Sequence, residues 1–368
     1  MSTLYIGVMS GTSLDGVDAV LMDFASGWKV LGHQALPFPK DLKQTLLDLN
    51  HSGFNELHHA ALATNALVKV YAHAIELLLA QVGQSASSVR AVGAHGQTVR
   101  HQPGMHDGTG YTLQLNNPSL LAELCGIPVV ADFRSKDVAA GGQGAPLAPA
   151  FHQYIWGNQA STTVVLNIGG MANLTILGED NSAMGFDCGP GNVLLDMWCQ
   201  QHLGQAFDAQ GAWGASGQSS DALLSYLLTE PFFTLPPPKS TGRDVFHADW
   251  LRHHLLPFSE LAAADVQASL TQLTARSASS AINTYAATAE QVWVCGGGAY
   301  NLHLMTLLQS SLPQLKVAPT DEIGLPPLQV EAAAFAWLAR QTVLGLPGNL
   351  PAVTGAKGLR VLGGLYPA

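Results

Sequence analysis

The stretch that decides the fold is "VMSGTSLDGVDAVLMDF", residues 8–24, in which a polar, glycine-containing segment separates two apolar runs. Residues 4–9 and 17–24 are short and aliphatic, which is typical of buried strands, and only one turn separates them. We therefore predict an antiparallel hairpin at the N-terminus. Its turn, residues 11–16, brings glycines, hydroxyls and one carboxylate together in a few residues.

The same arrangement begins again at residue 161. "STTVVLNIGGMANLTIL", residues 161–177, has two apolar runs around a Gly-Gly turn, and a third glycine turn at 296–298 follows another apolar run. A repeat of this architectural kind predicts two related α/β halves. We expect an N-terminal lobe over residues 1–133, a C-terminal lobe over 134–344, and a tail, 345–368, that completes the first lobe.

Apolar periodicity predicts the other elements. Residues 30–39 and 125–133 should be strands, and a buried strand from residue 89 should end at Gly93 or His95 and be followed by a polar loop. Helical patterns cover residues 56–82, as one or two helices, and residues 192–204, 221–228, 265–289 and 329–343. A further helix should follow the turn at 296–298.

The three glycine turns indicate a nucleotide site. Glycine lets backbone N–H groups approach an anion because it has no Cβ, and tight turns direct those groups outward. A single such turn could equally serve hairpin geometry alone. Other nucleotide or nucleophile motifs do not fit: the chain lacks Gly-Lys-Ser/Thr, Asn301 replaces a glycine of the dinucleotide pattern, and Asp15 replaces the last glycine of a Gly-x-Ser-x-Gly elbow.

Composition limits the class of protein. The 368 residues are 47% hydrophobic and 11% charged, which favours two well-packed domains. A net charge of -10 with no basic cluster argues against a nucleic-acid partner. The four cysteines lack zinc-site spacing, and neither a signal peptide nor an apolar run of about 18 residues is evident. We expect a cytoplasmic protein with reduced thiols and no membrane partner.

Seven segments in order resemble the anhydro-N-acetylmuramic acid kinases of bacteria, within the hexokinase–actin-like ATPase superfamily. They are "MSGTSLDGVDAVL", "AHGQTVRH", "DFRSKDVAAGGQGAPLAP", "NIGGMANLT", "GFDCGPGNVLLD", "KSTGRDVF" and "VEAAAFAWLA". The resemblance implies an α/β, two-lobed actin/hexokinase-like ATPase fold, with duplicated mixed-sheet domains and an interdomain cleft. It also implies ATP and Mg²⁺, opening of a 1,6-anhydro sugar ring by water with phosphorylation of O6, a role in peptidoglycan recycling, and a homodimer.

The glycine turns supply the expected nucleotide contacts. Asp15 resembles the superfamily acid that holds Mg²⁺ near the phosphates, although an Asx turn would also explain an aspartate there. The residues that we expect to contact ATP are Gly11, Thr12, Ser13, Leu14, Asp15, Gly16, Val17, Asp18, Gly169, Gly170, Asn173, Gly296, Gly297 and Gly298.

Asp187 is the candidate general base. It lies in "GFDCGPGN", residues 185–192, which we expect to be a loop before a helix, and the resemblance places the family's catalytic aspartate there. A carboxylate at this point could take the proton of the attacking water. Capping of the following helix is the structural alternative. Cys188 stands where threonine is usual in the family, and its thiol is a weaker donor.

The implied substrate carries a lactyl carboxylate, which needs a local cation. Arg134 can hold a carboxylate with two hydrogen bonds, and Lys136 lies beside it. Gln97 and Thr98 suit sugar hydroxyls. Glu331 could bind sugar or stabilise the start of the last helix. His95 and His101 suit hydrogen bonding better than metal binding, and the stretch 239–243 could reach phosphate or line the cleft.

Two other functions stay open at this point. A kinase of an ordinary sugar hydroxyl would use Asp187 to deprotonate that hydroxyl instead of water. A nucleotide-driven binding module would turn over ATP only with a partner protein.

Overall fold

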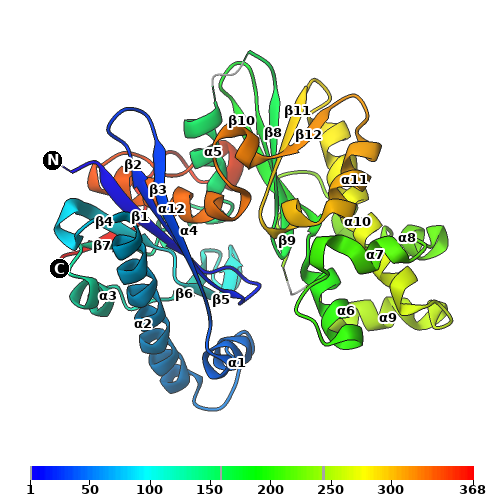
Figure 1. Ribbon diagram of the computed structural model, residues 1–368, viewed down its shortest axis with the longest axis horizontal. Helices are drawn as coiled ribbons and strands as arrows, with labels where there is room; N and C mark the ends of the chain where they lie inside the picture. Colours follow the sequence, from blue (N-terminus) through cyan, green and yellow to red (C-terminus); the bar gives the residue numbers. More distant parts are fainter. Residues whose placement is uncertain (1, 158–159, 243–244) are drawn as a thin grey trace. The chain divides into compact units, whose positions relative to one another are not determined.

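The computed structural model describes residues 2–157, 160–242 and 245–368, and the chain forms two compact units (Figure 1). The first unit is Met1–Ile155 with Gln329–Ala368, and the second is Trp156–Leu328. The sequence predicts boundaries after residues 133 and 344. The boundaries differ because α12 (Val330–Val343) packs on Gly7 and Gly93 in the sheet of the first unit, and α5 (Ala148–Trp156) packs on α12. The ring centroids of Tyr154 and Phe151 in α5 lie 5.7 and 6.1 Å from that of Trp337 in α12.

The main sheet of the first unit has six strands among the described residues. In spatial order it contains β13 (Gly364–Tyr366), β7 (Val129–Ala131), β4 (Val89–Ala94), β1 (Leu4–Met9), β2 (Gly16–Asp23) and β3 (Lys29–Pro37). Strands β1, β2 and β3 pair antiparallel in succession, which confirms the N-terminal hairpin, whereas β1–β4 and β4–β7 are parallel. The C-terminal tail joins this sheet through β13.

The second unit repeats this pattern of pairing. Its five-stranded sheet contains, in spatial order, β10 (Ala183–Pro190), β9 (Met171–Leu177), β8 (Thr163–Ile168), β11 (Gln291–Cys295) and β12 (Lys316–Pro319). Here β8–β9 and β9–β10 are antiparallel, and β8–β11 and β11–β12 are parallel. The predicted repeat of two related α/β halves is confirmed, because strand order and direction correspond from β3-β2-β1-β4-β7 to β10-β9-β8-β11-β12.

Two helices cover opposite faces of the first sheet. The expected helical stretch 56–82 is one helix, α2 (Glu56–Val82), and its Leu67 and Ile75 share a buried core with Ile6 and Val8 of β1. Helix α12 lies on the other face, against two glycines that are paired in register, Gly7 and Gly93. A Cβ on Gly7 would lie 1.8 Å from the Ala332 carbonyl oxygen, and one on Gly93 would lie 2.0 Å from that of Phe335. Only glycine permits so close an approach of helix and sheet.

In the described part of the chain, α2 alone is long and apolar enough to span a membrane by length and composition, with a mean hydropathy of 1.3. Such a test also selects core helices of water-soluble proteins. Because α2 buries one side against the sheet, its apolar composition is explained by the core of the first unit.

Helices α10 (Ala263–Tyr285) and α11 (Leu302–Ser311) cover one face of the second sheet. Ala278 and Leu304 of these helices are buried with Leu166, Phe186 and Val294 of the strands. The remaining described α-helices are α1 (Lys40–Asp48), α3 (Pro118–Cys125), α4 (Ser135–Ala139), α6 (Val193–Leu203), α7 (Ala212–Ser216), α8 (Asp221–Leu227), α9 (Ala248–Leu255) and α13 (Pro351–Thr354).

The prediction of a polar loop after the strand from residue 89 was wrong. Residues Gln97–Pro103 form β5, which pairs with β6 (Gly110–Leu115) in a two-stranded sheet. Polar side chains can form this strand because they bond across it: Gln114 Nε2 donates to Thr98 Oγ1 at 3.2 Å, and His101 Nδ1 lies 2.9 Å from Thr112 Oγ1.

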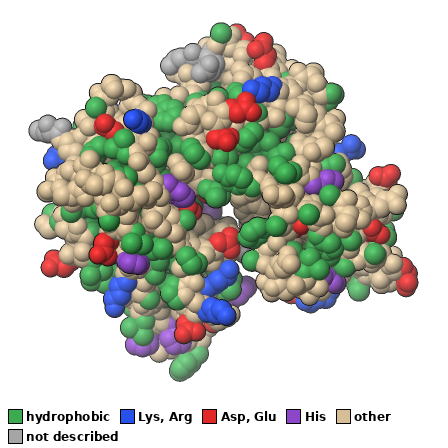
Figure 2. Space-filling view, viewed as in Figure 1, with side chains coloured by type: hydrophobic (Ala, Val, Ile, Leu, Met, Phe, Trp, Pro, Cys, Tyr) green, Lys and Arg blue, Asp and Glu red, His purple; other side chains and the backbone are tan. Residues whose placement is uncertain are grey.

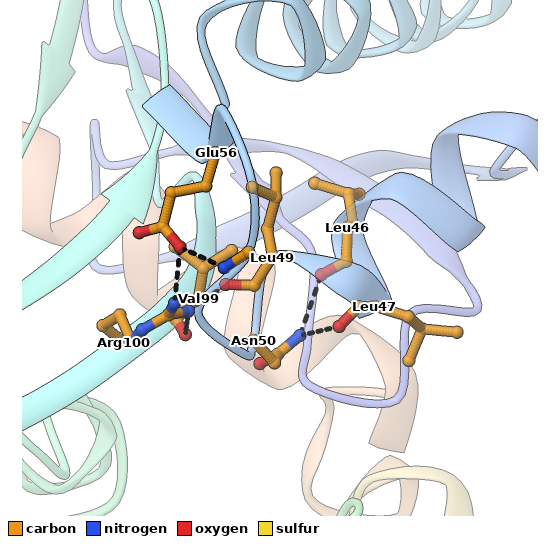
Figure 3. Close-up of polar contacts among 8 residues, drawn as sticks. Leu46, Leu47, Leu49, Asn50, Glu56, Val99 and Arg100 are labelled. Atoms are coloured by element: carbon orange, nitrogen blue, oxygen red, sulfur yellow. Dashed lines mark hydrogen bonds and ion pairs between the residues drawn. The ribbon is translucent and has the colours of Figure 1, made fainter. Parts of the chain in front are cut away.

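Arg100 ties the β5 strand to the end of α1. Its guanidinium donates to the Leu49 carbonyl and, at 3.4 Å, to Oε2 of Glu56, the first residue of α2 (Figure 3). Glu56 also accepts from the Gly53 amide, and Asn50 Nδ2 donates to the Leu46 and Leu47 carbonyls. These side chains give further donors to carbonyls in the last turn of α1 and just after it, where the regular helical hydrogen bonds end.

Candidate functional site

The first glycine turn joins β1 to β2 and is anchored by Leu14. This residue has φ 58°, its side chain is buried, and its N–H donates to the Gly11 carbonyl at 3.2 Å. A Cβ on Gly16 would lie 2.2 Å from the Leu36 carbonyl oxygen, so hairpin packing itself requires that glycine. Gly11 has no such constraint, since the nearest atom to an added Cβ is Ser13 Oγ at 3.7 Å. Packing therefore leaves Gly11 unexplained, and close approach of a ligand to the backbone would explain it.

The two acids of this hairpin differ in surroundings. The Asp15 side chain is 70% exposed, with Lys43 Nζ at 3.6 Å from its Oδ1. Asp18 lies within β2, where its Oδ1 is 2.7 Å from His33 Nε2. Asp15 is thus the more exposed of the two carboxylates, since the Asp18 side chain is 35% exposed. No group of three or more His, Cys, Asp or Glu side chains suited to a metal occurs among the described residues.

Residues after β4 contact the first turn directly. Gln97 Nε2 donates to the Gly11 carbonyl at 3.1 Å, and the buried Ser10 Oγ lies 2.7 Å from Tyr71 Oη and donates to the Gly96 carbonyl at 3.3 Å. Burial raises the pKa of Tyr71, so its hydroxyl stays protonated. A residue expected to bind sugar, Gln97, thus meets the turn expected to bind phosphate.

A histidine–arginine pair lies at the end of β4. Arg134 Nε donates to His95 Nε2 at 3.1 Å, and Arg134 Nη1 donates to the Gly144 carbonyl at 2.8 Å. Burial, and next the charge of Arg134, lower the pKa of His95 well below its ordinary value. The ring is therefore neutral with its proton on Nδ1. It also packs on Phe335 of α12 at a ring-centroid distance of 4.6 Å.

Glu331 lies in the first turn of the same helix, α12, and is partly buried. Thr98, the remaining residue expected to bind sugar, lies in β5 and accepts from Gln114. The first unit therefore contains the Gly11–Gly16 turn together with Gln97, Thr98, Arg134 and Glu331.

Asp187 lies in strand β10, so the prediction of a loop was wrong. Its partner in register on β9 is Asn173, and the partner of Asn173 on β8 is Asn167, so three polar residues form a row across the sheet. Paired residues point to the same face. The flanking Phe186 and Cys188 are buried in the core on the opposite face. The strand can carry a polar residue here because successive side chains point to opposite faces of the sheet, and only one of these faces is in the core.

The Asp187 carboxylate is held by residues far along the chain. Its Oδ2 accepts from the Thr241 amide at 2.9 Å, and the Asp187 amide donates to the Lys239 carbonyl at 3.1 Å. Cys188 Sγ donates to the Ala172 carbonyl at 3.3 Å, and burial, then the charge of Asp187, raise the pKa of its thiol. Of the stretch 239–243, Arg243 lies outside the described residues.

The turn between β8 and β9 is joined by backbone hydrogen bonds to the start of α6. Asn192 N donates to the Gly169 carbonyl at 2.8 Å and Gly191 N to that of Gly170 at 2.9 Å. An added Cβ on Gly169 would meet only the Met171 carbonyl oxygen, at 3.7 Å, so this glycine corresponds to Gly11 of the first unit.

The third glycine turn, after β11, contains two glycines that packing requires and one that it does not. A Cβ on Gly296, with φ 78°, would lie 2.6 Å from Asn167 Oδ1, and one on Gly298 would lie 2.4 Å from Ile168 Cγ2. A Cβ on Gly297 would meet Asn192 Nδ2 at 3.5 Å, an ordinary contact. Packing therefore requires the outer two glycines and leaves the middle one free to face a ligand.

The sequence that forms these turns and carboxylates is similar to that of a known protein family. A family model described as anhydro-N-acetylmuramic acid kinase matches residues 3–368. The chain belongs to the anhydro-N-acetylmuramic acid kinase family. It is 56% identical to the protein of that name from Albidiferax ferrireducens, with 100% of both chains covered, and 55% identical to that from Variovorax paradoxus, with 99% of both covered.

A solved structure shows the same fold as this member of the anhydro-N-acetylmuramic acid kinase family. It is the activator of the 2-hydroxyisocaproyl-CoA dehydratase from Clostridium difficile with bound ADPNP, which aligns with a TM-score of 0.50 at 11% identity over 93% of this chain and 96% of that one. The actin/hexokinase-like ATPase fold is thereby confirmed.

The sequence did not predict two contacts in this protein. It did not pair His95 with Arg134, and it gave no role to the contact of Lys239 and Thr241 with Asp187. The motif "KSTGRDVF" was the signal for the second contact, but only folding brings residues 187 and 241 together.

Proposed function

We propose that this protein is an ATP-dependent kinase that opens the 1,6-anhydro ring of anhydro-N-acetylmuramic acid and phosphorylates O6. The family membership supports the substrate and the reaction. The observation that carries the mechanism is the Asp187 carboxylate, which is fixed in a strand by the Thr241 amide and lies in register with Asn173.

In this reaction Asp187 takes a proton from a water molecule as the water oxygen bonds to C1 of the sugar. The bond between C1 and O6 breaks, O6 bonds to the γ-phosphorus of ATP, and ADP leaves. The product is N-acetylmuramic acid 6-phosphate. A positioned base contributes roughly 10²–10⁴-fold to such a step, whereas phosphoryl transfer depends mainly on alignment and charge neutralisation.

Backbone amides of the Gly11–Gly16 and Gly169–Gly170 turns contact phosphate oxygens in this proposal, and the Gly296–Gly298 turn contacts adenosine. Room beside the backbone at Gly11, Gly169 and Gly297 supports these roles. Asp15 holds Mg²⁺, which would neutralise phosphate charge when bound. Exposure of the Asp15 carboxylate supports this assignment.

Arg134 binds the lactyl carboxylate of the sugar, while Gln97, Thr98 and Glu331 bind its hydroxyl or amide groups. The position of Gln97, one hydrogen bond from Gly11, supports a sugar site beside the phosphates. His95 supports the role of Arg134 because it fixes one nitrogen of the guanidinium.

The enzyme works in the cytoplasm as a homodimer in this proposal. The described cysteines are free thiols, which suits a reducing compartment. Figure 2 shows Lys and Arg in small separate groups among Asp and Glu on the face drawn.

Light scattering coupled to size exclusion tests the dimer by mass, and a monomeric mass at micromolar concentration would contradict it.

Turnover in H₂¹⁸O tests the reaction. The purified protein is incubated with the anhydro sugar, ATP and Mg²⁺, and the product is analysed by mass spectrometry. Hydrolytic opening requires one ¹⁸O at the C1 hydroxyl. Unlabelled product with an intact anhydro ring would identify a kinase of an ordinary hydroxyl, and ATP turnover that needs a partner protein would identify a binding module.

A further inference from the structure

Strand β10 is an edge strand of its sheet, and a distant segment covers the edge at Asp187. An edge strand leaves alternate N–H and C=O groups without a partner strand. The Asp187 N–H points away from β9 and donates to the Lys239 carbonyl at 3.1 Å. Two residues later the chain returns, and the Thr241 N–H donates to Asp187 Oδ2 at 2.9 Å. The segment Lys239–Thr241 thus holds both the backbone and the carboxylate of one residue.

The Lys239 side chain holds this segment in place. Its Nζ donates to the Phe232 carbonyl at 3.1 Å and to the Phe233 carbonyl at 3.4 Å, and it lies 4.6 Å from the centre of the Phe232 ring. Both phenylalanines belong to the 3₁₀ turn Pro231–Thr234. The ammonium therefore fixes the segment by two charge-assisted hydrogen bonds and a cation–π contact.

The 3₁₀ turn in its turn packs against β10. A Cβ on Gly189, two residues after Asp187, would lie 2.9 Å from Phe233 Cε1, so the turn and the strand are in direct contact. A closed chain of contacts therefore runs from Asp187 through Thr241 and Lys239 to Phe233 and back to β10.

We propose that Lys239–Thr241 positions the Asp187 carboxylate, and that the Lys239 ammonium acts through this segment and does not bind phosphate. The inference rests on the proposed function, in which Asp187 is the base. One carboxylate oxygen is fixed by the Thr241 amide, so the plane of the carboxylate and the direction of its other oxygen are set. Positioning of this kind matters because a displacement of about 1 Å can cost roughly 10²-fold in rate.

Three lysine variants test the role of the ammonium. Lys239→Met keeps the aliphatic side chain and removes the charge, and we expect kcat to fall about 10- to 100-fold while KM for ATP and for the sugar change less than about 3-fold. Lys239→Arg can still donate to both carbonyls, so we expect kcat within about 5-fold of wild type. Lys316→Met is the matched control. Lys316 lies on β12, the opposite edge strand, and its Nζ stands 4.9 Å from the centre of the Trp293 ring. Loss of this ammonium should leave kcat unchanged.

A double-mutant cycle with Asp187→Asn separates positioning from a general loss of structure. If Lys239 acts through the Asp187 carboxylate, Lys239→Met should lower the residual activity of Asp187→Asn by less than about 2-fold. Equal losses in both backgrounds would overturn the inference. So would a wild-type kcat for Lys239→Met, or a rise in KM for ATP of about 10-fold at unchanged kcat, which would mean that Lys239 binds phosphate.

A backbone variant tests the amide itself. Thr241→Pro removes the N–H that reaches Oδ2 and should reduce kcat at least as much as Lys239→Met. If this variant fails to fold, the lysine series and the cycle still decide. Failure of the proposed function is seen separately, because the wild-type protein would then give no phosphorylated sugar.

Discussion

Replacing Gly169 by alanine tests whether the turn between β8 and β9 contacts ATP. The structure leaves room for the new methyl group, because its nearest neighbour would be the Met171 carbonyl oxygen at 3.7 Å, an ordinary contact. Alanine also reduces the freedom of the unfolded chain, which stabilises a protein by about 0.4–1 kcal/mol where the native backbone permits it. We therefore expect Gly169→Ala to unfold at the wild-type temperature or slightly above it.

Nucleotide binding should respond differently. If the Gly169 backbone lies against a phosphate, the methyl group displaces one charge-assisted hydrogen bond, worth about 1.5–3 kcal/mol. That loss corresponds to roughly 10- to 100-fold weaker binding of ATP. Calorimetric titration with a non-hydrolysable ATP analogue measures this effect directly, and a thermal melt of the same sample shows that the fold is intact.

Gly298→Ala is the contrasting variant in the same unit. Its Cβ would lie 2.4 and 2.5 Å from Cγ2 and Cβ of Ile168, a branched side chain that cannot rotate away freely. Overpacking of this kind costs about 1–3 kcal/mol, and each kcal/mol lowers Tm by roughly 2–4 °C in a unit of about 150–250 residues. Wild-type affinity for the analogue in Gly169→Ala would refute a phosphate contact at this turn. A wild-type Tm for Gly298→Ala would refute the packing argument.

Three further variants or conditions give clear expectations. Asp187→Asn should lower kcat by roughly 10³-fold with little change in nucleotide affinity, whereas Asp180→Asn in the exposed β9–β10 turn should not; near-normal turnover of Asp187→Asn would place the base elsewhere. His95→Leu should release Arg134 and raise KM for the sugar about 10-fold, while His95→Gln, whose amide oxygen can still accept, should stay within about 3-fold; equal effects of both would count against the pairing. Because burial lowers the pKa of His152 from 6.5 to about 3, the unfolded chain binds a proton in that interval that the folded chain does not. The free energy of unfolding should fall as the pH drops below 6.5, less so in His152→Phe, and equal pH slopes in urea titrations would contradict this.

Short-range patterns determined the elements of this protein. The hairpin of residues 4–9 and 17–24, its counterpart after residue 161 and the helix over 56–82 follow from local apolar periodicity, because each buries one face within a few residues of sequence. The glycine turns could be predicted for the same reason, because each follows an apolar run within a few residues of sequence. Seven segments of the sequence also identified the family.

Long-range contacts decided the rest. Local periodicity did not show that Gln97–Pro103 would pair as a strand, because its polar side chains find their partners on β6. Nor did it show that Gly7 and Gly93 would stand side by side to admit α12, which draws residues 329–368 into the first unit.

The candidate base, Asp187, shows most clearly what the sequence determined and what only the tertiary structure determined. The sequence alone named Asp187 through a motif, but expected a loop. Tertiary structure placed it in an edge strand, in register with Asn173 and under the amide of Thr241, 54 residues away. A residue type and its neighbours in sequence can indicate which chemistry is available. The direction of a carboxylate depends on donors that only the packed chain brings within hydrogen-bonding distance.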